Sequence, residues 1–283
     1  MKYYIVDAFA DKVFGGNPAG VVLDLDKSLS DVEMLNIAKE VGFSETAFIS
    51  RGTNGADFDL RFFTPTDEVP LCGHATIASF WHLAKIGMLT KESYIQNTKA
   101  GHLAIKVTPK ESDDFKVVMA QTAPSQIKSN LIFDEDFIAA FPNAKLHSSL
   151  PIDIWSTGLE DILLPIETPD ALNDLKINFD ALSELSKRYD VVGVHAFAIK
   201  DGEVHARNFA PLYGIDEESA TGTSNGALTA YLHHYLHPND EQLSLCVLQG
   251  ESMGETSAIF TTSIREKDNT QIWVGGSCSY MPI

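Results

Sequence analysis

Short apolar runs dominate the first 63 residues and predict strands. Apolar residues gather in 3–9, 14–23, 45–50 and 57–63, and Gly, Asn or Pro residues separate these runs. The link 51–56 contains Asn-Gly, which is typical of a β-hairpin turn. The pattern therefore predicts a strand-rich N-terminal region.

Two segments carry helical spacing instead. A capping box at 30–33 precedes apolar residues three or four positions apart, and Gly42 is placed to end that helix. A second helix is expected within 71–89, with Gly73 and His74 at its N-terminus. Its apolar stripe consists of Ile77, Phe80, Trp81, Ala84 and Met88.

The middle of the chain returns to strand-like patterns. Residues 101–108 and 115–121 read as strands, with a polar turn at 109–114 between them. Residues 121–150 are rich in Pro, Ser and Asn, and we interpret them as a crossover to a second half.

The second half repeats the order of features in the first. Residues 194–211 match 45–65, because both contain Ala-Phe, a Gly-containing turn, an Arg and Phe-x-Pro. An acidic loop, a Gly and an apolar helix then follow in each half, with Gly73 in the first and Gly222 in the second. Two homologous halves are the simplest explanation.

The repeat predicts an α+β fold in which each half is a strand-rich layer around a central helix. We place the first domain at 1–120, with its central helix starting near residue 73. We place the second at 121–283, with its central helix starting near residue 222. The C-terminal tail could pack back on the first domain.

The composition is that of a globular chain with room for two domains: 283 residues, 44% hydrophobic and 21% charged. A net charge of −18 argues against a nucleic-acid partner, because phosphate binding needs clustered Lys and Arg. No apolar run approaches the roughly 20 residues of a membrane span, and we expect no secretion signal. The widely spaced Cys72, Cys246 and Cys278 favour a reducing, cytoplasmic location.

Both predicted central helices begin among small residues. A helix N-terminus exposes unpaired N–H groups, and glycine lets a ligand approach the backbone closely. Two such helices sharing one cleft would bind a carboxylate or stabilise an enolate-like intermediate. Simple capping of buried helices by Ser and Thr explains the same pattern equally well.

Three side chains are candidates for acid–base chemistry. Glu45 precedes an apolar strand, and the Ala-Phe match places it opposite Val194, so that only one half has this carboxylate. Partial desolvation there would raise its pKa and suit proton transfer, although a solvated strand-end Glu is the plainer interpretation. His74 could donate or relay a proton, and Glu218 could hydrogen-bond His74 across the cleft. The acids at 216–217 are expected nearer to solvent.

Cys72 permits another interpretation. A thiol at a helix N-terminus can act as a base, but a two-base racemase needs a second thiol, and the equivalent residue is Thr221. A packed, inert thiol is therefore favoured. The remaining histidines, His233 and His234 among them, lack ligand spacing to any Cys or acid cluster, so no metal site is expected.

Motifs along nearly the whole chain occur in a recognisable order: GNPAGVV, SETAF, R-x-FTP with GHAT, R-N-FAP with ATGT, QGESMG and VGGSC. In this order they resemble the PhzF-like isomerase family of phenazine biosynthesis. The resemblance implies a diaminopimelate-epimerase-like fold, with two pseudo-symmetric domains that each wrap a β-roll around a central helix. It also implies a site in the cleft, a reaction without cofactor, and a homodimer.

The resemblance implies roles for particular residues. Glu45 falls at the Glu that moves a proton in the isomerisation of a cyclic dihydro-hydroxyanthranilate, and His74 falls at an assisting His. Glu218 stands where the family has Asp, Ser219 where it has Pro, and Thr223 where it has Ser. A carboxylate and a hydroxyl are kept, although the longer Glu side chain shifts its carboxylate.

Substrate contacts are expected from small and polar residues around these groups. The backbone N–H groups of Gly73, Gly222 and Thr223 would bind a carboxylate or a developing oxyanion. Thr221 and Asn17 complete the expected contacts.

We therefore expect an isomerase in which Glu45 moves a proton between carbons of a small carboxylic acid. Two alternatives stay open: an amino-acid or hydroxy-acid epimerase or racemase that uses Cys72, and a non-catalytic protein that binds small acids. The expected partners are a small-molecule carboxylate and a second copy of the chain, with no nucleic acid, membrane, metal or cofactor.

Overall fold

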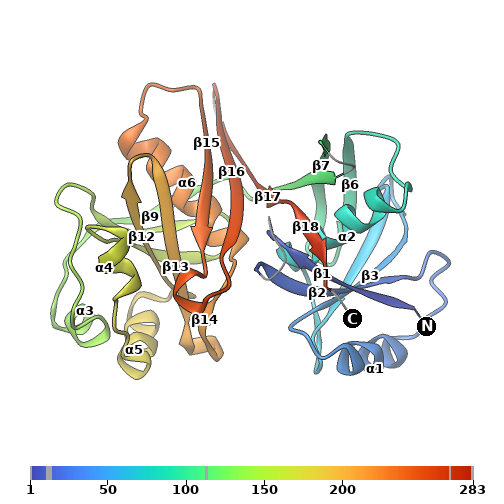
Figure 1. Ribbon diagram of the computed structural model, residues 1–283, viewed down its shortest axis with the longest axis horizontal. Helices are drawn as coiled ribbons and strands as arrows, with labels where there is room; N and C mark the ends of the chain where they lie inside the picture. The colour runs from blue at the N-terminus through green and yellow to red at the C-terminus, as the bar shows by residue number, and fades with distance from the viewer. Residues whose placement is uncertain (1, 11–14, 112–113, 268, 282–283) are drawn as a thin grey trace. The chain divides into compact units, whose positions relative to one another are not determined.

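The structure is a computed structural model of the chain (Figure 1). It describes residues 2–10, 15–111, 114–267 and 269–281. Strands and a few helices make up two compact units: unit 1 comprises Met1–Ala120 with Gly275–Ile283, and unit 2 comprises Gln121–Val274. The expected α+β class is confirmed. In the part of the chain that is described, no helix is both long and apolar enough to cross a membrane.

Unit 1 is built around helix α2 (Gly73–Lys85). Its strands are β1 (Tyr3–Ala8), β2 (Asn17–Leu23), β3 (Thr46–Arg51), β4 (Phe58–Phe63), β5 (Glu68–Val69), β6 (Ser93–Thr98), β7 (Gly101–Lys110), β8 (Asp114–Ala120) and β18 (Cys278–Tyr280). Hydrogen bonds join them in the order β18-β1-β2-β3-β4-β6-β7-β8, with β5 beside β4. The pairs β2–β3 and β4–β6 are parallel. Because α2 contacts both β1 and β8, the sheet curls round this helix.

Unit 2 is built around helix α6 (Gly222–Leu236). Its strands are β9 (Ser125–Leu131), β10 (Ile152–Ser156), β11 (Glu160–Pro165), β12 (Gly193–Lys200), β13 (Glu203–Ala210), β14 (Ile215–Glu218), β15 (Gln242–Gln249) and β16 (Ser257–Glu266). They follow the order β9-β10-β11-β12-β13-β15-β16, with β14 beside β13 and with β11–β12 and β13–β15 parallel. Strand β17 (Asn269–Gly276) spans the boundary between the two units along the chain.

The two units share one topology. Strands β1 to β4 and β6 to β7 of unit 1 correspond to β10 to β13 and β15 to β16 of unit 2, and α2 corresponds to α6. The parallel step from β2 to β3 contains helix α1 (Asp31–Val41), whereas the step from β11 to β12 contains α4 (Pro169–Asn173) and α5 (Phe179–Tyr189). This agreement in strand order and direction supports the repeat found in the sequence.

Local signals placed several elements correctly. Ser30 and Glu33 form the expected capping box of α1, and Gly42 ends the helix with a φ of 76°. The hairpin between β3 and β4 turns at Asn54 and Gly55, whose φ values of 54° and 86° suit a type I′ turn. These predictions are confirmed.

The central helix α2 differs from the expected one-sided helix. Every residue from Ala75 to Ala84 is buried, because the sheet surrounds the helix. The proposed stripe residue Met88 lies beyond the helix end at Lys85 and is 36% exposed. Burial on all sides therefore replaces the single apolar stripe.

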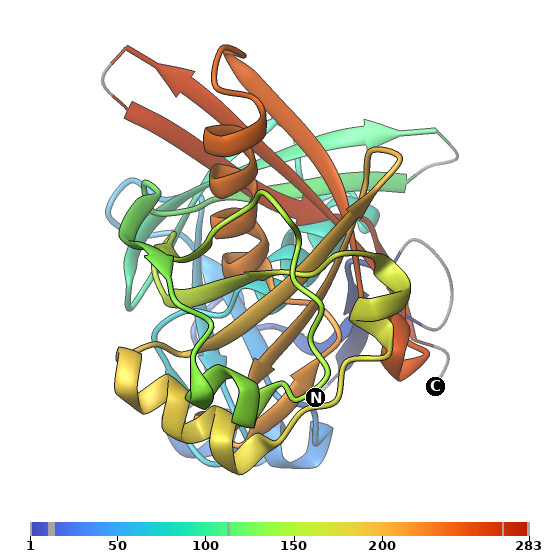
Figure 2. The same cartoon turned by 90° about the vertical axis from the view of Figure 1, so that its left-hand side faces the viewer.

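The segment interpreted as a crossover is also more structured than expected. Residues 121–150 contain strand β9 and helix α3 (Glu135–Ala140). Helix α3 lies beside α5, and both cover an apolar cluster on the sheet of unit 2 (Figure 2). In the predicted turn at 109–114, β7 continues to Lys110, and residues 112–113 lie outside the described part of the chain.

Candidate active site

Glu45 and His74 meet at the point where β3 and α2 begin. Glu45 directly precedes β3, and its carbonyl oxygen accepts a hydrogen bond from the N–H of Gly20 at 3.0 Å. A Cβ at Gly20 would lie 2.6 Å from the Thr46 hydroxyl oxygen, so only glycine allows β2 to approach β3 this closely. The GNPAGVV motif thus contributes to the backbone support of Glu45.

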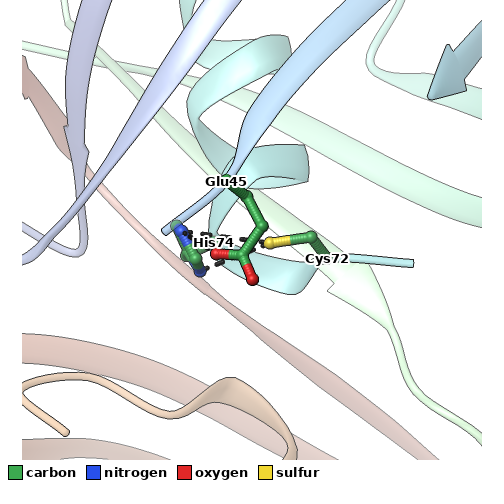
Figure 3. A group of neighbouring side chains, drawn as sticks. All are labelled: Glu45, Cys72 and His74. Atoms are coloured by element: carbon green, nitrogen blue, oxygen red, sulfur yellow. Dashed lines mark hydrogen bonds and ion pairs between the residues drawn. The ribbon is translucent and has the colours of Figure 1, made fainter. Parts of the chain in front are cut away.

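The side chains of Glu45, Cys72 and His74 point toward one another (Figure 3). His74 Nε2 lies 3.4 Å from Glu45 Oε2, and Cys72 Sγ lies 3.4 Å from His74 Nδ1. The side chains of His74 and Glu45 are 10% and 21% exposed. A small molecule can therefore reach a carboxylate that is largely removed from water.

The charge state of His74 follows from its surroundings. Burial lowers the pKa of His74 below its usual value, although the neighbouring Glu45 carboxylate acts in the opposite direction. The imidazole is therefore neutral near pH 7. In the tautomer with its proton on Nε2, it donates toward the Glu45 carboxylate and leaves Nδ1 as an acceptor.

Cys72 is packed, as expected, but its thiol also contacts His74. Cys72 is the N-cap residue of α2 and is 8% exposed, but its side chain makes no capping hydrogen bond. Its sulfur instead contacts His74. Gly73 adds little bulk beside them, because a Cβ there would meet only the Met119 methyl group, at 3.7 Å.

In unit 2 a hydrogen-bond network holds the segment before α6. The Thr221 hydroxyl donates to Glu218 Oε2 at 2.6 Å and accepts from Gln249 Nε2 at 3.1 Å. Gln249 Nε2 also donates to the carbonyl oxygen of Glu218 at 2.7 Å, and its Oε1 accepts from the Thr221 N–H at 3.2 Å. Because both ends of this amide are used, Gln249 sets the direction of the Thr221 hydroxyl and the position of Glu218.

The network continues into the core of unit 2. Asn225 Nδ2 donates to Gln249 Oε1 at 2.7 Å, and Asn225 Oδ1 lies 3.2 Å from His195 Nε2. Burial lowers the pKa of His195 to about 4, so this imidazole is neutral. Sequence reasoning missed Gln249, Asn225 and His195. For His195 and Gln249 the signal available was a polar residue among apolar neighbours in a strand, whereas Asn225 follows Thr and Ser and has no such signal.

A buried acid of β11, Asp161, interacts with Ser224 and with the charge of Glu218. Ser224 donates a hydrogen bond to Asp161 at 2.6 Å. Burial raises the pKa of Asp161 to about 7, the Ser224 hydrogen bond opposes this shift, and the charge of Glu218 adds to it. Asp161 was also missed, because nothing in the local pattern of β11 distinguishes it from a strand-end acid.

The other acids of this loop behave differently from one another. Asp216 is exposed, as expected. Glu217 is not near solvent: its side chain is 15% exposed and forms two 2.8 Å hydrogen bonds with Arg207. In unit 1, Arg61 pairs in the same bidentate way with Glu68, at 2.8 and 2.6 Å. In each half, the Glu that comes directly after the first Asp beyond Phe-x-Pro is therefore the partner of the repeated arginine.

The strand register corrects the alignment of the two halves. Strand β3 pairs Phe48 with Arg61, and strand β12 pairs Ala196 with Arg207. Phe48 and Ala196 also face equivalent apolar clusters, under α1 and α5 respectively. Phe48 is therefore equivalent to Ala196, whereas the Ala-Phe match had paired Phe48 with Phe197.

This correction moves the counterpart of Glu45. Counting back along the strands, Glu45 corresponds to Gly193 and not to Val194. The expectation was wrong because a matched dipeptide does not reveal which face of a strand each residue occupies, and a shift of one residue reverses the faces. Gly193 also lacks a carboxylate, so the asymmetry between the halves remains.

The remaining predicted residues occupy defined places within their own units. Asn17 is the first residue of β2, buried and opposite Ala8. Thr223 lies in the first turn of α6, where its carbonyl oxygen accepts a hydrogen bond from Thr157 at 2.9 Å. The expected contact of His74 with a residue of unit 2, and the substrate contacts of these residues, stay predictions.

Unit 1 also contains a cavity of about 450 Å³ beside α1. Its lining includes Lys27 and Arg61, which are paired with Asp59 and Glu68 at 2.6 Å each. Both of these cations therefore already have acidic partners.

Several known proteins are similar to this chain in sequence and in fold. A family model described as phenazine biosynthesis-like protein matches residues 6–281. An uncharacterized isomerase of Clostridium acetobutylicum is 39% identical over 269 residues, covering 90% of this chain and 87% of that protein. A crystal structure of the phenazine biosynthesis protein of the PhzF family from Bacillus anthracis is 31% identical, with a TM-score of 0.87, covering 100% of this chain and 98% of that one.

A further relative has a named reaction. The trans-2,3-dihydro-3-hydroxyanthranilate isomerase of Pseudomonas fluorescens is 28% identical, covering 98% of this chain and 95% of that protein. The motifs, the fold and these matches agree along the chain. The protein belongs to the phenazine biosynthesis-like (PhzF) family and is an isomerase.

Proposed function

We propose that the protein moves a proton between two carbons of a small carboxylic acid, without a cofactor, and that Glu45 removes and returns this proton. One observation carries the proposal: the partly buried Glu45 carboxylate lies 3.4 Å from the imidazole of a neutral His74. A general base needs a position that a substrate can reach and a neighbour that orients it. Glu45 has both.

The steps follow from these two groups. The Glu45 carboxylate takes a proton from an acidic C–H bond, and the electron pair of that bond moves into the conjugated system of the substrate. The protonated Glu45 then returns the proton to another carbon, so that substrate and product differ only in the positions of hydrogen and double bonds. Neutral His74 keeps the carboxylate oriented and can donate a hydrogen bond as the substrate changes.

The substrate carboxylate needs hydrogen-bond donors, and uncharged backbone N–H groups can serve. We propose that backbone N–H groups at Gly73 or Gly222 bind it, because each residue begins a helix, α2 or α6, whose dipole favours an anion at that end. The hydroxyl of Thr221, held by Gln249, limits the freedom of Glu218. We propose that Glu218 and Thr223 orient the substrate.

The proposal extends to the type of reaction that the Pseudomonas fluorescens relative is named for. The Glu at position 218 is longer by a methylene than the Asp expected from the family pattern. A misplacement on the scale of an ångström can cost about 100-fold in rate. Because this difference can change which substrate fits, we propose only the substrate class, a small cyclic or unsaturated carboxylic acid.

Hydrogen exchange tests the role of Glu45. Candidate carboxylic acids are first screened for thermal stabilisation of the protein, and hits are incubated in D2O and followed by NMR. We expect deuterium incorporation with the wild type and its loss in Glu45→Gln. The matched control is Glu40→Gln, which removes an exposed carboxylate of α1 in the same unit. Exchange by Glu45→Gln at the wild-type rate would overturn the proposal.

A second candidate function uses Cys72. Its sulfur lies 3.4 Å from His74, so the thiol and Glu45 could act as a pair of bases in an epimerase or racemase. In that case Cys72→Ala abolishes activity, and the product shows inversion at one carbon. Under the favoured proposal, Cys72→Ala keeps most of its deuterium exchange.

The assembly and location of the enzyme are part of the proposal. We propose a homodimer in the cytoplasm, in line with the family resemblance and with the widely spaced cysteines. Light scattering coupled to gel filtration measures the mass directly, and a monomeric mass would contradict this part.

A further inference from the structure

Three side chains that can each bind a metal ion lie close together at the start of α2. Glu45, Cys72 and His74 each offer one ligand atom, and these atoms lie within 4.8 Å of one another. They come from two backbone segments, the residue before β3 and the first turn of α2. No ligand spacing is visible along the chain, because Glu45 is distant in sequence from Cys72 and His74.

The separations are close to those around a tetrahedral ion. Zinc bonds of 2.0–2.3 Å place neighbouring ligand atoms about 3.3–3.6 Å apart. Here His74 Nε2 lies 3.4 Å from Glu45 Oε2 and 3.9 Å from Cys72 Sγ. All three ligand atoms lie within 4.8 Å of one another, so the Cys72 sulfur has to move closer to the other two atoms for one ion to contact all three.

We propose that Glu45, Cys72 and His74 form a three-ligand site for Zn²⁺ or a divalent ion of similar softness. A thiolate, an imidazole and a carboxylate are all zinc ligands, and three of them leave a fourth position open. Side-chain exposures of 10% for His74 and 21% for Glu45 leave a route for the ion. When the ion binds, the Cys72 proton leaves to solvent, the imidazole proton of His74 is carried on Nδ1 so that Nε2 can bind, and no electron is transferred.

The donor set also predicts selectivity. Mg²⁺ and Ca²⁺ prefer oxygen ligands in larger number, which this cluster does not supply. Zn²⁺ and Co²⁺ accept sulfur and nitrogen ligands in tetrahedral geometry. The site should therefore bind Zn²⁺ and Co²⁺ in the presence of excess Mg²⁺.

Binding has a consequence for activity that rests on the proposed function. An ion on the Glu45 carboxylate occupies the electron pair that would remove the substrate proton, so Zn²⁺ should inhibit the isomerase reversibly. The binding itself does not depend on the role of Glu45 in catalysis. The two ideas can therefore fail separately.

Cobalt spectroscopy tests the site directly. The chelator-treated wild-type protein is titrated with Co²⁺, and the near-ultraviolet thiolate-to-cobalt charge-transfer band is recorded. We expect this band at one equivalent, its loss in Cys72→Ser, and its bleaching by Zn²⁺ but not by Mg²⁺. The matched control is Cys246→Ser, which removes an exposed thiol of β15 in unit 2 and should keep the band.

Further variants separate this inference from the proposed function. His74→Ala should weaken Co²⁺ binding at least 10-fold by isothermal titration, whereas Glu45→Gln should weaken it but keep the Cys72 band. Loss of deuterium exchange in metal-free Glu45→Gln concerns only the catalytic proposal. No band in the wild type, or an unchanged band in Cys72→Ser, would overturn the metal site.

Discussion

Helices α2 and α6 begin in the same way and hold different chemistry. Each starts with a glycine, Gly73 or Gly222, after an extended N-cap residue. Cys72 has φ −142° and ψ 118°, Thr221 has φ −127° and ψ 107°, and neither side chain caps its helix. The backbone device was therefore kept in both units, and the side chains around it differ.

In unit 1 the neighbouring side chains lie at longer distances from one another. The contacts of His74 with Glu45 and Cys72 are 3.4 Å long. In unit 2 the Thr221 hydroxyl lies 2.6 Å from the Glu218 carboxylate and also accepts from Gln249. A carboxylate held by such short hydrogen bonds keeps a fixed position and is suited to orienting a substrate. Under the proposed function, Glu45 of unit 1 would transfer the proton and Glu218 of unit 2 would orient the substrate.

The largest effect should come from removing the two carboxylates in turn. Glu45→Gln should lower kcat by about 100-fold to 10,000-fold, the usual contribution of general acid–base catalysis. Glu218→Gln keeps an acceptor for the Thr221 hydroxyl, so its loss should be clearly smaller and appear partly in KM. Steady-state kinetics on an identified substrate measures both. Equal losses in kcat would remove the proposed division between the units.

The next effect concerns pH and is expected from unit 2. The folded pKa of Asp161 is raised from 3.8 to about 7. A raised folded pKa means that this contribution to stability is full below about pH 4 and is lost as the pH rises toward 7. The loss amounts to roughly 4 kcal/mol, at 1.36 kcal/mol per pKa unit.

Asp161→Asn should remove this particular dependence. The difference in unfolding free energy between the variant and the wild type, from urea titrations, should shift in favour of the variant as the pH rises from about 4 to 7. Ser224→Ala serves as the control, because it removes the hydrogen bond to Asp161 but keeps the titrating carboxyl. A difference that stays constant with pH would show that Asp161 does not titrate in this range.

A buried glutamine in each unit allows the two units to be compared by their effects on stability. Gln249 in unit 2 uses both ends of its amide on Thr221, Glu218 and Asn225. Gln96 in unit 1 is equally buried, but among the described residues its Oε1 has no hydrogen-bond partner, and its Nε2 contacts are 3.4 and 3.6 Å long.

Replacing each glutamine by leucine should therefore have unequal effects. Gln249→Leu leaves buried polar groups without partners and should lower the free energy of unfolding by about 1–3 kcal/mol for each such group. Gln96→Leu should be close to neutral, because it removes a poorly paired amide. Urea unfolding measures both changes. Equal destabilisation would mean that the network around Gln249 adds no stability.

The smallest expected difference lies at the two N-cap residues themselves. Thr221→Val removes the hydroxyl between Glu218 and Gln249 and should cost about 1 kcal/mol of stability. Cys72→Ser removes no capping hydrogen bond and should change stability by less than about 0.5 kcal/mol. Thermal and urea unfolding of the two variants can be compared directly. A larger cost for Cys72→Ser would show that packing of the sulfur matters more than the Thr221 hydrogen bonds.

Several local features of this structure could be predicted from the sequence. The capping box at Ser30, the turn at Asn54 and the Gly42 helix end depend on a few neighbouring residues, so their physical causes lie within one short segment. The repeat of Arg61 and Arg207 revealed the doubled topology. The sequence also marks Glu45 and His74 as candidates, and the structure places their side chains 3.4 Å apart.

The sequence by itself determined the α+β class, the two repeated halves and the residue types available for chemistry. Tertiary structure alone decided which faces of the strands correspond, so that Glu45 is equivalent to Gly193. It alone joined Cys72 to Glu45 and made Gln249 the support of Thr221. Turns and caps are decided by neighbours along the chain, whereas strand register, burial and side-chain clusters depend on segments that meet only when the sheet closes round its helix.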